Sequence, residues 1–145
     1  MSKEVLQKEN VKLKETIATK EEAIKKTGNI LVEQGYVDSS YIDSMLEREK
    51  ITSTYMGNFV AIPHGTEDSK ALIQESGISI IQVPDGVDFG DGRIVKILIG
   101  IAGKGDEHLE ILSKIAIVCS EEENIQKMID AGSAEELLDQ FSEVN

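Results

Sequence analysis

The sequence predicts an α/β fold: a single domain, residues 1–145, with a small mixed β-sheet flanked by helices on both faces. Ile, Val and Leu supply 39 of the 145 residues, enough for an aliphatic core, and β-branched Ile suits the pleated surface of a sheet. Segments with helical periodicity alternate with short β-branched runs, as in α/β domains. No repeat or flexible linker divides the chain, which favours one domain.

The N-terminal part is predicted to form an edge strand and then two helices. The strand candidate is VKL at 11–13. Thr19 and Glu22 fit a capping box, in which two side chains satisfy free N–H groups at a helix start, and Gly35 suits the left-handed cap at the end of that helix. Asp38 is predicted to start the second helix. The apolar face of that helix consists of Ile42, Met45 and Leu46, and Arg48 lies near its C-terminal end.

Three further segments have the composition of buried strands. They are NFVAI at 58–62, GISIIQV at 77–83 and RIVKILIGIAG at 93–103, each short, β-branched and bounded by turn residues. Pro63 ends the first of them, because proline cannot donate a hydrogen bond to a neighbouring strand.

The C-terminal part is predicted to be helical. The segment 107–119 has apolar residues at helical spacing, namely Leu109, Leu112, Ile115 and Cys119. Two later helices are predicted, separated by Gly132, and their starts are indicated by two further Ser-x-x-Glu pairs. These pairs are Ser120 with Glu123 and Ser133 with Glu136.

Charge, apolar run length and cysteine content exclude several classes of function. The net charge is −12 and the pI about 4.6, which opposes binding to nucleic-acid phosphates. No apolar run reaches the ~18 residues of a membrane helix, and the N-terminus lacks the apolar region of a secretory signal, so a cytoplasmic protein is expected. The single cysteine, Cys119, lies in an apolar run and is interpreted as a buried structural thiol that cannot form an internal disulfide.

Only two histidines exist, and both lie where the backbone must turn. His64 follows a strand and a proline in AIPHGT, and His108 follows GKGD at a predicted helix start. In α/β folds, ligand sites form at strand ends and helix N-termini, where free N–H groups and the helix dipole favour anions. Each histidine could instead be a turn residue with a satisfied hydrogen bond.

The stretch around His64 resembles the phosphorylation site of the mannitol/fructose class of enzyme IIA in the bacterial sugar phosphotransferase system. The matching pattern is Glu49, a gap of six residues, Met56-Gly57, two free positions and then VAIPHG at 60–65. Similarity to the mannitol-specific members extends to SGISIIQVPDGVDFG and ILIGIAGKGDEHLEIL. The resemblance covers roughly residues 10 to 143.

This resemblance implies a phosphocarrier with no cofactor. His64 would accept a phosphoryl group from the phosphocarrier HPr and donate it to a cysteine of a mannitol-specific enzyme IIB. The sugar would cross the membrane through another protein, enzyme IIC, so this chain would meet the membrane only indirectly. The residue type fits, because an imidazole with a pKa near 6.5 is largely neutral at pH 7 and its nitrogen is then a nucleophile.

Four more residues are candidates for the site. By resemblance, His108 and Arg48 match positions that stabilise charge near the phosphorylated histidine. Gly65 has no Cβ and would let backbone N–H groups approach the phosphate. Glu67 could orient the ring of His64 by accepting its second N–H, or could be only a carboxylate in the first turn of a helix.

The same residues raise two other classes of function. A metal hydrolase is disfavoured, because the two histidines are 44 positions apart, no HExxH motif occurs and Cys119 is isolated; no metal ligand is assigned. A regulatory protein of the enzyme IIA type, acting through phosphorylation-dependent protein contacts, remains the alternative.

Overall fold

A computed structural model describes residues 4–141, and its centre is a five-stranded sheet in the order β1-β4-β5-β3-β2. The strands are β1 (Val11–Lys12), β2 (Tyr55–Gly57), β3 (Val60–Ala61), β4 (Gly77–Asp88) and β5 (Ile94–Ala102). β1 runs parallel to β4 and β3 runs parallel to β5, whereas the β2–β3 and β4–β5 pairs are antiparallel. The predicted mixed sheet is confirmed, and of the predicted edge strand at 11–13 the residues Val11–Lys12 pair at the edge of the sheet.

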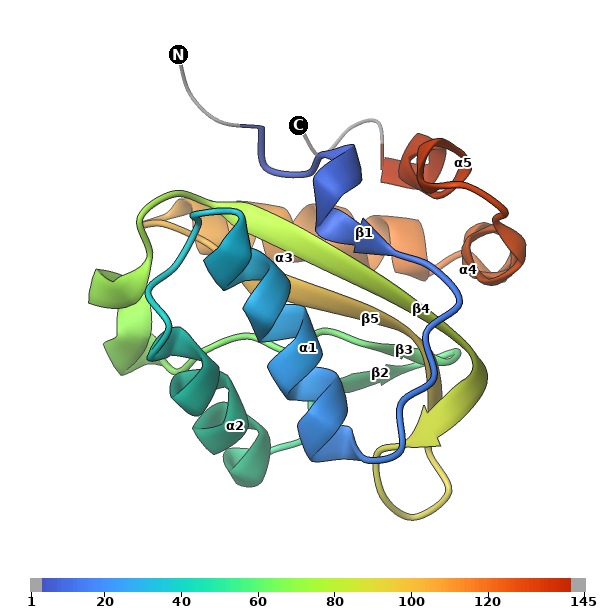
Figure 1. Cartoon of the computed structure of the whole chain (residues 1–145), viewed down its shortest axis with the longest axis horizontal. Helices are drawn as coiled ribbons and strands as arrows, with labels where there is room; N and C mark the ends of the chain where they lie inside the picture. The colour runs from blue at the N-terminus through green and yellow to red at the C-terminus, as the bar shows by residue number, and fades with distance from the viewer. Residues whose placement is uncertain (1–3, 142–145) are drawn as a thin grey trace.

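Helices cover both faces of the sheet, as the sequence predicts. The α-helices are α1 (Lys20–Glu33), α2 (Tyr41–Ile51), α3 (Glu107–Cys119), α4 (Glu122–Asp130) and α5 (Ala134–Leu138). Three short 3₁₀-helices are η1 (Lys8–Asn10), η2 (Glu67–Leu72) and η3 (Asp139–Phe141). α1 and α2 lie on one face, and α3, α4 and α5 lie on the other (Figure 1).

Each face of the sheet carries its own apolar core. Side chains alternate between the two faces along a strand, so Ile81 and Leu98 pack in the core under α1 and α2, whereas Ile80 and Ile99 pack in the core under α3 and α4. All four are almost fully buried. Because helices cover both faces of the sheet, the two long strands are continuous apolar runs and do not alternate between apolar and polar residues.

The first predicted helix has the expected ends. The Thr19 side chain accepts a hydrogen bond from the Glu22 N–H at 3.2 Å. At the other end Gly35 has a φ of +80°, and the Tyr36 N–H donates to the Leu31 carbonyl, which is the six-to-one hydrogen bond of a Schellman motif.

The second helix begins later than predicted. Its first residue is Tyr41, and Asp38 lies in the preceding turn, where its carboxylate accepts hydrogen bonds from the Ser40 N–H and hydroxyl. An aspartate can hold such a turn as well as a helix start. Met45 is buried against α1 as predicted, and a Cβ on Gly28 of α1 would lie 2.8 Å from Ile42. The glycine therefore lets the two helices approach closely.

Two strand boundaries differ from the prediction. In the predicted strand at 58–62 only Val60–Ala61 is a strand, because Asn58 and Phe59 both have positive φ and join β2 to β3 as a two-residue hairpin turn. The predicted strand at 77–83 continues to Asp88 through an irregularity that contains Pro84. Proline is tolerated at such a break in strand pairing.

One prediction for the C-terminal helices is wrong, and it concerns the start of α4. The predicted helix over 107–119 is confirmed as α3; its buried residues are Ile111, Ile115 and Cys119, whereas Leu109 is 71% exposed. Ser120 does not cap α4: it follows the last residue of α3, and its hydroxyl donates to the Ile117 carbonyl. The hydroxyl thus satisfies a free carbonyl at the end of one helix instead of a free N–H at the start of the next.

Other details of this region are confirmed. The Ser133 side chain accepts from the Glu136 N–H at the start of α5, and Gly132 separates α4 from α5. Cys119 is buried, and burial raises the pKa of its thiol to about 12. Within residues 4–141, none of the helices has the length and apolar character required to cross a membrane.

Candidate active site

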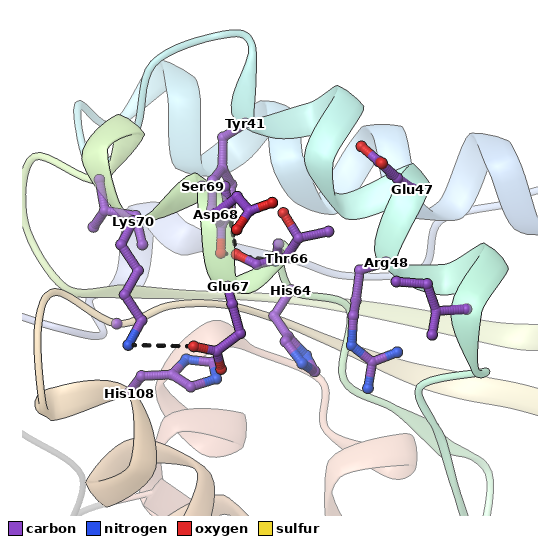
Figure 2. A pocket seen from close by; sticks show the side chains of 14 residues that line it. Tyr41, Glu47, Arg48, His64, Thr66, Glu67, Asp68, Ser69, Lys70 and His108 are labelled. Carbon is purple, nitrogen blue, oxygen red and sulfur yellow. Dashed lines mark hydrogen bonds and ion pairs between the residues drawn. The ribbon is translucent and has the colours of Figure 1, made fainter.

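Both histidines emerge at the same edge of the sheet. His64 follows β3 and pairs with Ile101 of β5 in an isolated parallel bridge, and His108 lies in the first turn of α3, which follows β5. Because β3 and β5 are parallel neighbours, their carboxyl ends bring the two following segments together. The two side chains line one cavity of about 350 Å³, together with Arg48 (Figure 2).

His64 is held by a hydrogen bond to its own backbone segment. Its Nδ1 lies 2.8 Å from the carbonyl oxygen of Ile62. A carbonyl can only accept, so Nδ1 carries the proton, and in the neutral ring Nε2 then carries the lone pair. The residue is 9% exposed and lines the cavity. The lone pair on Nε2 makes this nitrogen the one that is chemically able to act as a nucleophile.

His108 lies against His64. The two ring centroids are 5.3 Å apart and the ring planes are tilted by 53°. Gly103 makes this approach possible, because a Cβ there would lie 2.3 Å from the Cα of His108. The first turn of α3 and the strand end are thus packed backbone against backbone.

The pKa values of both imidazoles are lowered. For His64 the main cause is burial, and the charge of Arg48 adds to it, while the Ile62 hydrogen bond and the charges of Glu49 and Glu67 act in the opposite direction. For His108 burial again comes first, followed by the charges of His64 and Lys70. Both rings are therefore mainly neutral at pH 7, which a nucleophilic imidazole requires.

Arg48 lies near the end of α2, and its guanidinium lines the cavity. One amino group, Nη1, donates to the Thr52 carbonyl at 2.7 Å, which holds the long side chain in place. In Figure 2 the ring of His64 lies between this guanidinium and the ring of His108. A guanidinium keeps its charge and has five N–H donors, so it can bind an anion beside His64 while it also contacts Thr52.

Tyr41 of α2 fixes the backbone directly after His64. Its hydroxyl accepts from the Gly65 N–H at 2.9 Å and donates to the Ile101 carbonyl at 2.9 Å. A Cβ on Gly65 would lie 2.6 Å from the tyrosine ring and 2.4 Å from the Ser69 hydroxyl. The Gly65 N–H is therefore already paired with Tyr41, and the missing Cβ of Gly65 makes room for the tyrosine ring. Burial raises the pKa of Tyr41 to about 12, so the hydroxyl stays protonated.

A second contact from α2 holds the next residue. The Thr66 N–H donates to the Ser44 hydroxyl at 2.9 Å, and the two side-chain hydroxyls are 3.0 Å apart. Together with Tyr41, this contact fastens the loop after His64 to α2.

Glu67 faces a cation rather than the ring of His64. Its carboxylate lies 3.9 Å from the ammonium group of Lys70, one turn further along η2. The hydrogen bond that orients His64 goes to Ile62, and within residues 4–141 Glu67 makes none to His64. The charge of Glu67 nevertheless acts on both histidines, because it opposes the lowering of their pKa values.

The structure brings together all five predicted residues and adds others. His64, His108, Arg48, Gly65 and Glu67 line the same cavity. Other residues that the sequence did not indicate as site residues also line it, among them Tyr41, Lys70 and Gly103. Ser44 does not line the cavity but holds Thr66, which does. Of these residues, Gly103 could have been found from the sequence, because it is a glycine at the end of a predicted strand. The contacts of Tyr41 and Ser44 join positions more than 20 residues apart and leave no local sequence pattern.

The arrangement suits transfer of an anionic group to a ring nitrogen. A neutral imidazole offers a lone pair, a guanidinium and an ammonium lie at the same cavity, and the positive end of the α3 dipole faces it. Among residues 4–141, no three His, Cys, Asp or Glu side chains are grouped so that they could hold a metal ion.

Comparison with known proteins gives matches over nearly the whole chain. The family model for the phosphoenolpyruvate-dependent sugar phosphotransferase system, EIIA 2, matches residues 4–144. The mannitol-specific phosphotransferase enzyme IIA component of Geobacillus stearothermophilus is 66% identical over 145 residues, which is 100% of both chains.

Solved structures agree with these matches. The crystal structure of IIA mannitol from Escherichia coli superposes with a TM-score of 0.88 at 37% identity, over 94% of this chain and 99% of that one. The same enzyme IIA in complex with phosphorylated mannitol enzyme IIB superposes with a TM-score of 0.87 at 35% identity, over 94% of this chain and 96% of that one. With a family model that spans nearly all of its residues and full-length identity well above 30%, the chain belongs to the EIIA 2 family of the phosphoenolpyruvate-dependent sugar phosphotransferase system.

Proposed function

We propose that the chain is a phosphocarrier that takes a phosphoryl group from phosphorylated HPr onto Nε2 of His64 and passes it to the cysteine of a mannitol-specific enzyme IIB. The observation that carries the proposal is the 2.8 Å contact between Nδ1 of His64 and the Ile62 carbonyl. With the proton on Nδ1, the lone pair is on Nε2, in a cavity whose lining includes the cationic side chains of Arg48 and Lys70.

The transfer consists of two displacements at phosphorus. In the first, the Nε2 lone pair of His64 forms an N–P bond as the N–P bond to the donor histidine breaks, and the donor nitrogen keeps the electron pair. In the second, the thiolate of the acceptor cysteine forms an S–P bond as the His64 N–P bond breaks. The histidine returns to its neutral form, so the cycle needs no cofactor.

Arg48 and His108 are proposed to stabilise the charge on the transferred group. In-line phosphoryl transfer places negative charge on three oxygens, and the protein contributes mainly positioning and hydrogen-bond donors. A cation 4 Å from the phosphate gains about 4 kcal/mol at an effective dielectric of about 20. Surface carboxylates beyond the Debye length of about 8 Å are largely screened, so the net charge of −12 does not prevent phosphorylation.

The comparisons support mannitol as the sugar whose uptake the chain serves. The curated relative from Geobacillus stearothermophilus is a mannitol-specific enzyme IIA component, and the similar Escherichia coli enzyme IIA was solved in complex with phosphorylated mannitol enzyme IIB. In the proposed role the sugar never touches this chain, and the membrane is reached only through enzyme IIC. We place the chain in the cytoplasm, where phosphoenolpyruvate is made.

The test is incubation with phosphoenolpyruvate, enzyme I and HPr, followed by intact-mass measurement. We expect the wild-type protein to gain one phosphoryl group that is lost in acid and retained in alkali, as a phosphoramidate is. His64→Ala should gain none, and His108→Ala should still gain one, more slowly. Full labelling of His64→Ala would contradict the proposal.

A further inference from the structure

A buried carboxylate lies beside the site with no role in the transfer described above. Glu49, in the last turn of α2, is 5% exposed. Both of its oxygens accept from the Thr54 N–H at 3.1 Å, and one also accepts from the Thr54 hydroxyl. The ammonium of Lys20 on α1 lies 3.9 Å away and is partly exposed. A carboxylate with this much burial needs such partners to remain charged.

The hydrogen bonds of Glu49 continue to the ring of His64. The carbonyl of Thr54 accepts from the Ile62 N–H at 3.0 Å, and the carbonyl of Ile62 is the group that accepts the proton of His64 Nδ1 at 2.8 Å. Three successive contacts therefore join the Glu49 carboxylate to the imidazole, through the backbone of Thr54 and Ile62. Thr54 and Ile62 each use the backbone N–H toward the preceding group and the carbonyl toward the next one.

We infer that Glu49 is a positioning residue for His64: its carboxylate fixes the Thr54 backbone, which fixes the Ile62 carbonyl and so keeps the proton of His64 on Nδ1. The expected effect of Glu49 on phosphoryl transfer rests on the proposed function. The expected effect of Glu49 on the tautomer of His64 does not depend on that function. The lone pair stays on Nε2 only while the Ile62 carbonyl stays in place.

A carboxylate suits this position better than an amide. An ionised carboxylate only accepts hydrogen bonds, and it meets two donors of Thr54 here. A glutamine would bring two N–H groups of its own and would lose the charge. The charge of Glu49 also acts on the ring of His64. Burial and the charge of Arg48 lower the pKa of His64, whereas the Ile62 hydrogen bond and the charges of Glu49 and Glu67 raise it.

The test compares Glu49→Gln with Asp43→Asn. Asp43 is an exposed carboxylate on the same helix, so both variants lose one negative charge from α2. The tautomer and pKa of His64 are measured by nitrogen NMR of the imidazole, with His108 as an internal reference, and phosphoryl acceptance from HPr is measured as a rate.

In Glu49→Gln we expect a larger fraction of the tautomer with the proton on Nε2, a lower pKa of His64 and an unchanged pKa of His108. Phosphoryl acceptance should slow by on the order of tenfold or more, because small misplacements of a reacting atom are costly. Asp43→Asn should match the wild type in all of these measurements. A wild-type tautomer and rate in folded Glu49→Gln would overturn the inference.

A second variant keeps the test decisive if Glu49→Gln does not fold. Glu49→Asp retains the charge but shortens the side chain by one methylene, so it should shift the tautomer in the same direction, and a wild-type tautomer there would overturn the inference equally. Failure of the proposed function would look different. It would leave wild-type His64 unphosphorylated, while the tautomer would still respond to Glu49.

Discussion

At the scale of single residues, the proton on His64 decides the chemistry. The Ile62 carbonyl holds that proton on Nδ1, and burial of the ring lowers its pKa. In the proposed transfer, the first effect determines which ring nitrogen can react, and the second keeps the ring neutral. Both effects come from backbone geometry and packing, so the site needs no separate general base.

The lowered pKa values predict how the protein responds to acid. In an NMR titration both histidines should have pKa values below the usual 6.5, and phosphoryl acceptance should fall as the pH drops through the pKa of His64. The unfolded chain then binds more protons than the folded one, so the stability contributed by the neutral rings is present above about pH 6.5 and is lost as the pH falls. A pKa above 6.5 for His64 would contradict this account.

Arg48 and His108 are predicted to act on the transfer rate and not on the fold. Arg48→Ala and His108→Ala should each slow phosphoryl acceptance by on the order of 100-fold, the typical loss for one donor to a developing charge. Circular dichroism should be unchanged in both. Arg93→Ala is the control for the guanidinium, because Arg93 is exposed on the β4–β5 connection. Wild-type rates in both site variants would remove these residues from the mechanism.

The Tyr41 hydroxyl is predicted to stabilise the loop after His64. Tyr41→Phe leaves the Gly65 N–H and the Ile101 carbonyl without their shared partner, which should lower the free energy of unfolding by about 1–3 kcal/mol. Denaturant unfolding measures this loss. Tyr55→Phe, at a half-buried ring of β2, should change it by less than about 0.5 kcal/mol; an equal loss in both variants would refute the role given to the hydroxyl.

At the scale of elements, the sequence predicts best where local chemistry decides the structure. The caps at Thr19 and Gly35 and the two long strands involve neighbouring residues, and all are confirmed. The sequence gives no signal for β2, because a strand of three residues is too short to show a period, and helical spacing alone cannot say which side of α3 meets the sheet, so the exposure of Leu109 was not predictable. The sequence predicts that the two histidines come together, because strand ends in α/β folds carry ligand sites. It does not predict the contacts of Tyr41, which join residues far apart in the chain.

The junction between β5 and α3 should tolerate no side chain at Gly103. Gly103→Ala places a Cβ 2.3 Å from the Cα of His108, so the start of α3 must move, and we expect a loss of stability of about 1–3 kcal/mol together with slower phosphoryl acceptance. Gly132→Ala is the matched control, because a Cβ there meets nothing closer than 3.7 Å. Thermal unfolding and the transfer rate measure both variants, and wild-type behaviour of Gly103→Ala would show that the close approach is unimportant.

At the scale of the whole molecule, the sheet order creates the site. Arg48, His64 and His108 come from three distant parts of the chain, and they meet because β3 lies parallel and next to β5 while α2 packs across the loop after His64. The cavity lining includes the cationic side chains Arg48 and Lys70 together with three carboxylates, those of Glu47, Glu67 and Asp68. In the proposed function, the fold therefore positions the cationic side chains beside His64, and the imidazole of His64 forms the bond to phosphorus.

The most direct test of the account is NMR of the phosphorylated protein labelled with nitrogen-15, in which coupling to phosphorus identifies the phosphorylated ring nitrogen. The hydrogen bond from Nδ1 to Ile62 predicts that phosphorus couples to Nε2 of His64 and that Nδ1 keeps its proton. Coupling to Nδ1, or to a ring nitrogen of His108, would contradict it.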